Sequence, residues 1–329
     1  MNPHNPIPPF KVAVIQHPPV FLNLEASLAR AEALVAEAAQ GGAQVIVFPE
    51  TWLPGYPVWL DYAPNAALWD HPPAKALFRL LSENALSIPG PDMDRLRTMA
   101  RTADAYLVMG AHERDGGTLY NTTVYLDRDG ERYTTHRKLM PTYTERLVWG
   151  RGDGSTLSVL DTDYGPLGGL ICWEHWMPLA RAAMHAKGEA LHVAQWPWAK
   201  ELHHIASRHY AFEGQCFVLV AGSVMSRGEA IAGVRSLVGD EREAIELLAG
   251  MPGKDEDLLL NGGSAVIAPD TGYVAGPVLG EPTILYAQVD PRRITEGHLA
   301  LDTDGHYARP DVFHLTVDER PQANVSFEP

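Results

Sequence analysis

The chain has 329 residues, of which 46% are hydrophobic and 20% charged, with a net charge of −15 and a pI of about 5.3. This is the composition of a globular protein, and no apolar run reaches the ~18 residues that indicate a membrane span. The acidic balance repels phosphate backbones and anionic lipids. We therefore expect neither nucleic acid nor a membrane as a partner.

The chain lacks the features of an exported protein. Its first ten residues, MNPHNPIPPF, have neither the basic stretch nor the apolar core of a secretory signal. Its two cysteines, Cys172 and Cys216, are too few for a disulfide framework, and a reducing compartment suits a reactive thiol. These observations predict a cytoplasmic location.

The first fifty residues predict a β-α-β unit. Residues 11–16 and 43–50 are strand-like apolar runs, and residues 22–42 between them have helical periodicity. Asn23 is suited to cap the N-terminus of this helix, and the glycine pair at 41–42 to end it. The face expected to pack inward carries Leu24, Leu28, Val35 and Ala38.

Strands and helices continue to alternate along the chain. Helices are expected at about 92–102, 178–187 and 201–213, and strands at 105–113, 119–127, 165–172, 190–195, 216–222, 264–269, 272–277 and 283–289. Strands separated by helices, followed by paired strands, favour a layered α/β sandwich. We expect a single domain over residues 1–300 and a C-terminal tail over residues 301–329.

Three stretches lack a regular pattern. Residues 51–73 are rich in Trp, Tyr and Pro and are expected to form a pocket wall or lid. Residues 226–263 are charged, with a short helical pattern at 241–248, and are expected to contact another subunit. The tail at 301–329 is expected to be an arm in subunit contacts or a frayed end.

The most informative residue is Cys172, which ends an apolar run and precedes a proline suited to begin a helix. A cysteine in an apolar run is most often a small buried hydrophobic residue, and Cys216 fits that interpretation. A step from strand to helix instead places Cys172 near a helix N-terminus, which favours a thiolate and can bind an oxyanion. Cys172 is therefore the candidate nucleophile.

Two other segments supply groups that a catalytic thiol needs. Glu50 ends the strand-like run VIVFPE, where partial desolvation raises the pKa of a carboxyl group and improves it as a general base. Lys138 lies in a basic cluster with His136 and Arg137, which by itself is typical of a solvated loop. Glu145, seven residues after Lys138, is placed to pair with the lysine or to orient it.

Several residues near these segments are candidates for substrate binding, and each has a structural alternative. The aromatic residues line a pocket or pack in the core, and Glu174 and His175 face the pocket or cap the following helix. The candidate binding residues are Trp52, Tyr56, Trp173, Glu174, His175, Gln195 and Trp196, with Trp59 and Trp198 in the same aromatic clusters.

Other patterns point away from metal and phosphate chemistry. His203, His204 and His209 lack the i, i+4 spacing that aligns zinc ligands on a helix. The segment GRGDGS lacks the lysine of a phosphate-binding loop, and no G-x-S-x-G motif indicates a serine hydrolase. We expect neither a metal nor an organic cofactor.

Nearly the whole chain resembles the nitrilase branch of the nitrilase superfamily of carbon–nitrogen hydrolases. The segments that carry the resemblance are KVAVIQ, FPETWLPGYP, HRKLMPTYTERLVWGRGDGS, GLICWEHWMPLAR, RHYAFEGQCFVLVAGS and GHYARPDVF. The family's Glu–Lys–Cys triad corresponds to Glu50, Lys138 and Cys172, and its further active-site glutamate to Glu145. The Cys-Trp-Glu order at 172–174 is typical of nitrilases rather than of amidases or carbamoylases.

The resemblance implies a fold and an activity. The fold is a four-layer αββα sandwich whose subunits form homodimers, often extended into spirals or filaments. The activity is hydrolysis of a small uncharged nitrile by two waters to a carboxylic acid and ammonia, through a thioimidate and a thioester on Cys172. Lys138 and the backbone N–H of Trp173 would stabilise the negative charge that develops on nitrogen.

The sequence leaves alternatives open. An amidase needs the same nucleophile, base and cation, and a nitrilase can release some amide as a by-product. A non-catalytic scaffold is disfavoured because all three triad positions are occupied. The aromatic residues are compatible with an aromatic nitrile and equally with an aliphatic nitrile or a dinitrile.

Overall fold

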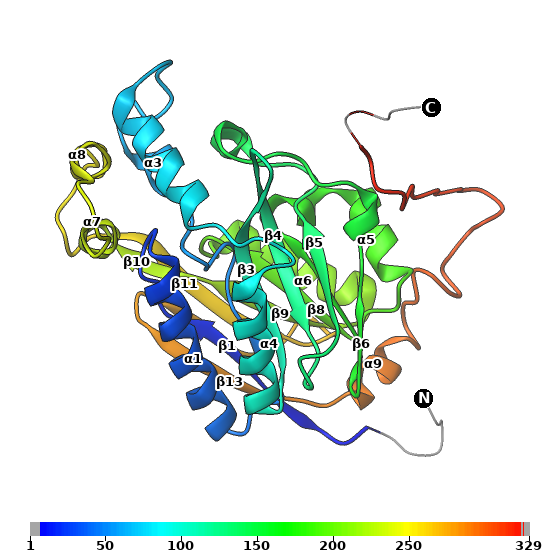
Figure 1. Ribbon diagram of the computed structural model, residues 1–329. Coiled ribbons are helices and arrows are strands. Elements are labelled where there is room, and N and C mark those ends of the chain that lie inside the picture. The colour runs from blue at the N-terminus through cyan, green and yellow to red at the C-terminus, as the bar shows by residue number, and fades with distance from the viewer. Residues whose placement is uncertain (1–6, 324, 326–329) are drawn as a thin grey trace.

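A computed structural model describes residues 7–323 and 325 and contains two β-sheets (Figure 1). One sheet is built from β1 (Phe10–Gln16), β2 (Val45–Val47), β3 (Tyr106–Asp115), β4 (Thr118–Leu126), β5 (Tyr133–Arg137) and β13 (Thr283–Val289). The other contains β6 (Leu160–Thr162), β7 (Gly165–Ile171), β8 (Leu191–Trp196), β9 (Phe217–Gly222), β10 (Val224–Ser226), β11 (Leu258–Ile267) and β12 (Tyr273–Leu279). The strand orders are β13-β1-β2-β3-β4-β5 and β10-β11-β9-β8-β7-β6, with β12 paired to β11.

Helices cover the outer face of each sheet. The helices α1 (Leu24–Gln40) and α4 (Pro91–Ala103) lie side by side and pack on the first sheet (Figure 1). On the second sheet the covering helices are α5 (Pro178–His185) and α6 (Glu201–Gly214). The four layers confirm the predicted αββα sandwich.

Alternation along the strands explains why both faces of each sheet are buried. In β1, Val12 and Val14 point into the core between the two sheets, whereas Ala13 and Ile15 point toward the helices. The strands at the centre of each sheet are parallel, so their carboxyl ends lie at one edge. Residues that follow β2 and β7 are thereby brought to the same end of the sandwich.

The structure corrects two of the predicted irregular stretches. Residues 51–73 contain α2 (Trp59–Tyr62) and the start of α3 (Pro72–Glu83). Within residues 226–263, α8 (Arg242–Ala249) confirms the short helical pattern predicted at 241–248, and α7 (Arg227–Arg235) is the helix that was not predicted. In α3 the prolines occupy the first turn, where a missing N–H costs nothing, so they begin the helix rather than interrupt it. A short helix, α9 (Arg292–Gly297), follows the last strand.

The described part of the tail crosses the surface of its own chain. Residues 301–323 form no helix or strand and run toward α5 (Figure 1). Gln322 donates its backbone N–H to Asp153, and Lys187 pairs with Glu319. The N-terminal segment at 1–6 and the last tail residues, 324 and 326–329, lie outside the described residues. Within residues 7–323, no helix has the length and apolar character to cross a membrane.

Candidate active site

Cys172 lies directly after β7, at the first position of a 3-10 turn, η3 (Cys172–Trp176). The helix predicted to begin at Pro178 is confirmed as α5 (Pro178–His185), and the 3-10 turn lies between its N-terminus and Cys172. Cys172 adopts φ +53°, a left-handed conformation that costs energy for a residue with a side chain. Its thiol is free and 5% exposed. Such strain turns the thiol out of the strand direction, as at other catalytic nucleophiles.

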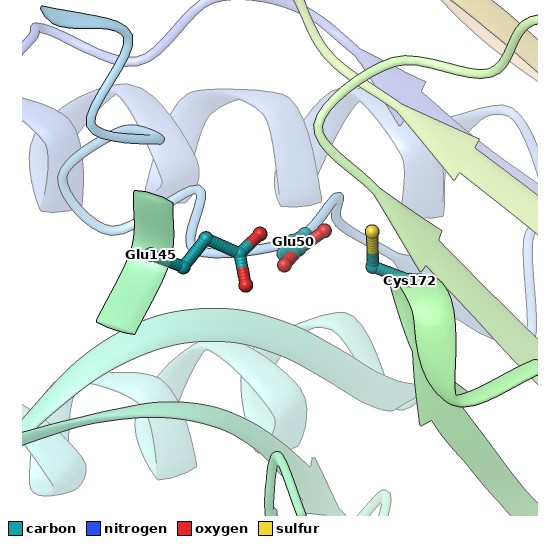
Figure 2. Close-up of side chains that lie close together, drawn as sticks. All are labelled: Glu50, Glu145 and Cys172. Atoms are coloured by element: carbon teal, nitrogen blue, oxygen red, sulfur yellow. The ribbon is translucent and has the colours of Figure 1, made fainter. Parts of the chain in front are cut away.

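Glu50 follows β2 and faces the thiol across the end of the sandwich (Figure 2). Its Oε1 accepts hydrogen bonds from Lys138 Nζ at 2.9 Å and from Asn121 Nδ2 at 2.7 Å. Its Oε2 is buried and has no hydrogen-bond partner within the described residues. A carboxylate oxygen of Glu50, one of Glu145 and the sulfur of Cys172 all lie within 4.8 Å of one another. The free oxygen is therefore available to a proton from the thiol.

Lys138 follows β5 and lies between two carboxylates. Its ammonium contacts Glu145 Oε2 at 2.7 Å as well as Glu50, and all three side chains are at most 2% exposed. Glu145 belongs to the 3-10 turn η1 (Tyr143–Leu147), and it also accepts from the Tyr56 hydroxyl at 3.0 Å and the Thr142 N–H at 2.6 Å. The three ionisable groups hold one another in place through these direct contacts.

Burial controls the protonation states of these groups. Burial raises the pKa of Glu50 to about 7, and the Lys138 ammonium opposes this increase only in part. Burial also raises the pKa of the Cys172 thiol well above its usual range, and the Glu50 carboxylate adds to that effect. Burial by itself lowers the pKa of Lys138, but the charges of Cys172 in its ionised form and of the Glu145 and Glu50 carboxylates outweigh it and hold that pKa well above its usual range. At neutral pH the site contains a thiol, an ammonium and a base near its midpoint.

Glu50, Glu145 and Cys172 present the kinds of atoms that ligate metal ions. The Lys138 ammonium already contacts both carboxylates, at 2.9 and 2.7 Å. A divalent cation there would lie against a buried positive charge. The residues do not fit a metal, and the cation of this site is the lysine.

The thiol opens into a pocket of about 400 Å³. Two of the seven predicted binding residues, Tyr56 and Trp173, line it, and so does Trp198. Trp173 is 41% exposed, so it is accessible to a ligand. The other lining residues are Asp61, Tyr62, Thr142, Tyr143, Thr144, Glu145, Cys172, Pro197, Lys200, His203 and Leu260.

The remaining aromatic candidates do not line this pocket, because they pack elsewhere. Trp52 belongs to the core beneath α1 and α4, where its ring meets Phe48 and its N–H donates to the His17 carbonyl at 2.6 Å. Trp196 is fully buried beneath α6 and stacks on His175. The apolar surfaces of these two rings are covered by other side chains of the protein.

The remaining polar candidates are likewise buried behind the site. The Glu174 carboxylate accepts from the backbone N–H groups of Ile171 and Leu139 at 2.6 and 2.7 Å, and it pairs with His136. Gln195 lies between the sheets, where its Nε2 donates to the Phe48 carbonyl at 2.7 Å. His175 contacts the backbone carbonyl of Cys172 at 2.8 Å. These residues fix the backbone around the nucleophile instead of contacting a ligand.

Sequence reasoning missed Asn121, which holds Glu50 from β4. A signal was present, because an asparagine interrupts the β-branched and aromatic pattern of the run LYNTTVYL. Asp61, Lys200 and Leu260 of the pocket were also missed. They come from three distant parts of the chain, so only the folded structure brings them together.

Comparison with known proteins places this geometry in a family. A family model described as carbon-nitrogen hydrolase matches residues 11–298. An aliphatic nitrilase of Sinorhizobium fredii is 40% identical over 96% of this chain and 98% of its own length. A bifunctional nitrilase/nitrile hydratase of Nicotiana tabacum is 37% identical, covering 99% and 91%, and nitrilase 1 of Arabidopsis thaliana is 37% identical, covering 99% and 92%.

Solved structures support the fold. A carbon-nitrogen hydrolase from Helicobacter pylori aligns with a TM-score of 0.66 at 18% identity, covering 88% of this chain and 92% of that chain. Nit3 of Saccharomyces cerevisiae, a member of branch 10 of the nitrilase superfamily, aligns with a TM-score of 0.61 at 19% identity, covering 92% and 97%. By the family model and by its curated relatives, the chain belongs to the carbon–nitrogen hydrolase family, in its nitrilase branch.

Proposed function

We propose that the protein is a nitrilase that converts an organic nitrile and two waters to a carboxylic acid and ammonia. The observation that carries the proposal is the Glu50 carboxylate, which has one oxygen without a hydrogen-bond partner within the described residues and an oxygen within 4.8 Å of the buried sulfur of Cys172. Relatives named as nitrilases, 36–40% identical over nearly the full chain, support the same activity.

In the first half of the proposed reaction, the thiol adds to the nitrile. Glu50 takes the thiol proton as the sulfur of Cys172 attacks the carbon of R–C≡N, and the same proton is returned to nitrogen. The product is a thioimidate bound to the enzyme. Lys138 and the backbone N–H of Trp173 stabilise the negative charge on nitrogen, and the same N–H is among the groups that lower the pKa of the resting thiol.

In the second half, two waters complete the hydrolysis. Glu50 removes a proton from the first water as it adds to the thioimidate carbon, nitrogen is protonated, and ammonia leaves to form a thioester. The second water attacks the thioester in the same way and releases the acid, and the thiol of Cys172 recovers its proton. Glu145 holds Lys138 in place through both halves.

The pocket supports a small uncharged nitrile as the substrate. Its volume of about 400 Å³ accommodates a compact molecule, and Tyr56, Trp173 and Trp198 provide apolar surface for its substituent. Both aliphatic and aryl groups fit that description. An amidase with the same triad is the alternative, and it is less supported because the nearly full-length relatives at 40% and 37% identity are named nitrilases.

We further propose that the protein is a cytoplasmic homo-oligomer. One face of α6 carries Leu202, Ile205 and Phe212 at 47%, 49% and 45% exposure, which supports a subunit contact between apolar faces. The division into a hydrolase domain at 1–300 and a tail at 301–329 that acts as an arm in subunit contacts belongs to this proposal. Two free, buried cysteines are consistent with a reducing compartment.

The test is product release from matched nitriles and amides. Purified protein is incubated with aliphatic, aryl and arylalkyl nitriles and with the corresponding amides, and ammonia, acid and amide are all quantified. The proposal predicts ammonia and acid from at least one nitrile. Ammonia released only from the amides would instead establish the amidase.

Two cysteine variants separate the nucleophile from a structural thiol. Cys172→Ala is expected to abolish turnover while the protein remains folded, because only the sulfur is lost from a position whose conformation stays the same. Cys216→Ala is the matched control, since that thiol is also buried but packs among apolar residues beneath α6. Nitrile hydrolysis retained by Cys172→Ala would refute the mechanism.

A further inference from the structure

A chain of buried polar groups extends from the nucleophile into the second sheet and its covering helix. His175 Nδ1 lies 2.8 Å from the backbone carbonyl oxygen of Cys172, and His175 Nε2 lies 3.0 Å from His192 Nε2. His192 Nδ1 lies 3.0 Å from both carboxylate oxygens of Glu189, and Oε2 of Glu189 also accepts from the Tyr210 hydroxyl. All four side chains beyond Cys172 are at most 5% exposed. The proposed chemistry uses none of them.

The hydrogen bonds allow one arrangement of protons at the inner end of this chain. A carbonyl oxygen only accepts, so His175 Nδ1 carries a proton and donates to Cys172. In a neutral His175, Nε2 is then an acceptor, and His192 Nε2–H must donate to it. Burial lowers the pKa of His175 to about 3, which keeps its ring neutral. His192 is therefore fixed as a donor toward His175.

Glu189 supplies the proton that this arrangement requires at the outer end. With His192 Nε2 protonated, its Nδ1 accepts from a protonated Glu189 or, as an imidazolium, donates to an ionised one. Burial raises the pKa of Glu189 to about 7, so the carboxyl group can retain that proton. The backbone of β7 leaves room for it, because a Cβ at Gly168 would lie 2.2 Å from Glu189 Oε1.

The carbonyl that His175 holds belongs to the peptide unit that carries the Trp173 N–H. In a planar trans peptide the C=O and N–H bonds point in opposite directions, so anchoring the oxygen on one side aims the N–H at the other. That N–H is among the groups that lower the pKa of the Cys172 thiol, so it lies on the side of the sulfur. A hydrogen bond to the oxygen also polarises the peptide and strengthens its N–H as a donor.

We propose that His175 is a positioning residue, oriented by His192 and Glu189, that aims and strengthens the Trp173 N–H as the donor to the substrate nitrogen. The chain of hydrogen bonds also holds the left-handed backbone at Cys172. This role resembles that of the outer groups that orient the ligands of catalytic metals. The inference rests on the proposed nitrilase reaction.

Two substitutions at His175 test the proposal, because an asparagine amide can occupy the place of Nδ1. His175→Phe keeps a ring to stack on Trp196 but loses the donor, and kcat is expected to fall about 100-fold with little change in KM. His175→Asn keeps a donor for the Cys172 carbonyl, so it is expected to recover most of kcat. It leaves His192 Nε2–H without an acceptor, so its Tm is expected to be lower than that of the wild type.

The controls separate a positioning role from a purely structural one. His204→Phe changes a buried histidine of α6 outside this chain of hydrogen bonds and is expected to retain the wild-type kcat. If His175→Phe does not fold, His192→Phe is assayed instead, with an expected loss of about tenfold in kcat. A kcat that is unchanged in the assayed Phe variant, or that falls as far in His175→Asn as in His175→Phe, would overturn the inference. A wild-type protein that hydrolyses no nitrile would overturn the proposed function instead.

Discussion

At the scale of single residues, the buried site keeps the thiol of Cys172 in its neutral form until a base removes the proton. The Cys172 thiol is neutral at rest because burial and the Glu50 carboxylate disfavour a second anion. The base is kept near pH 7 because burial raises its pKa more than Lys138 lowers it. A base whose pKa lies near the working pH is ionised in a large fraction of the molecules and still binds a proton strongly. The thiol and the base therefore have the protonation states that proton transfer requires before a substrate binds.

The raised pKa of Glu50 predicts an acid limb in the pH profile. Glu50 accepts a proton only as a carboxylate, so the active fraction decreases as the pH falls through about 7. Below that value kcat/KM is expected to fall about tenfold per pH unit. Ammonia release measured from about pH 5 to about pH 9 gives the midpoint of this limb. A midpoint near the ordinary value of 4.5 would show that the base is not this buried carboxyl group.

At the scale of elements, β7 packs closely against β8 and against the opposite sheet, and this packing fixes the position of Cys172 at its end. A Cβ at Gly169 would lie 2.4 Å from the backbone oxygen of Val193 in β8 and 2.8 Å from the Tyr125 hydroxyl across the sheets. Gly169 lies on β7, three residues before Cys172, which follows the end of that strand. The position of the thiol therefore depends on the absence of a side chain at Gly169.

The close approach of β7 and β8 predicts that Gly169→Ala is destabilising. The added methyl group must move a backbone oxygen, so the variant is expected to lose about 1–3 kcal/mol of unfolding free energy. Displacement of β7 is also expected to lower kcat, measured by ammonia release beside thermal unfolding. Gly117→Ala is the matched control, because a Cβ there meets no described atom within 4 Å. Equal stability of the two variants would contradict this account of β7.

The strand–helix alternation was predictable from sequence because it depends on local patterns, whereas Glu50, Lys138 and Cys172 were assigned as a triad by resemblance to a family. Periodicity located α1, and Asn23 caps it as predicted by accepting from the Ala26 N–H. The prolines of α3 were misread as marks of a loop, since the same residue begins some helices and ends others. The partners of Glu50 and the packing of Trp52 depend on contacts between distant segments, which no local pattern contains.

At the scale of the whole molecule, the sandwich leaves an apolar surface uncovered. The inner face of α6 packs on the second sheet through residues such as Tyr210 and Ala211, but its outer face carries exposed apolar side chains. Leu179 of α5 is also exposed, at 68%. When a helix carries apolar side chains on both faces, one face is typically buried in its own domain and the other against a partner.

This surface predicts the effect of a charge on assembly. Ile205→Glu places a carboxylate in the middle of the outer face of α6, and burial of that charge against a partner is costly. The variant is expected to elute as a smaller species than the wild type, with its mass measured by light scattering. Leu299→Glu is the control, because Leu299 is 89% exposed and lies outside α5 and α6. Wild-type assembly retained by Ile205→Glu would exclude this face as the contact.

The neutral resting thiol has a consequence for the lifetime of the enzyme. Peroxide and dissolved oxygen attack thiolates far faster than thiols, and low-pKa cysteines are the ones converted to sulfenic acid. Cys172 is 5% exposed, burial raises the pKa of its thiol, and in the proposed mechanism it becomes anionic only while Glu50 removes its proton. The idle enzyme is therefore expected to tolerate storage in air without added reductant, even though its activity depends on a single sulfur atom.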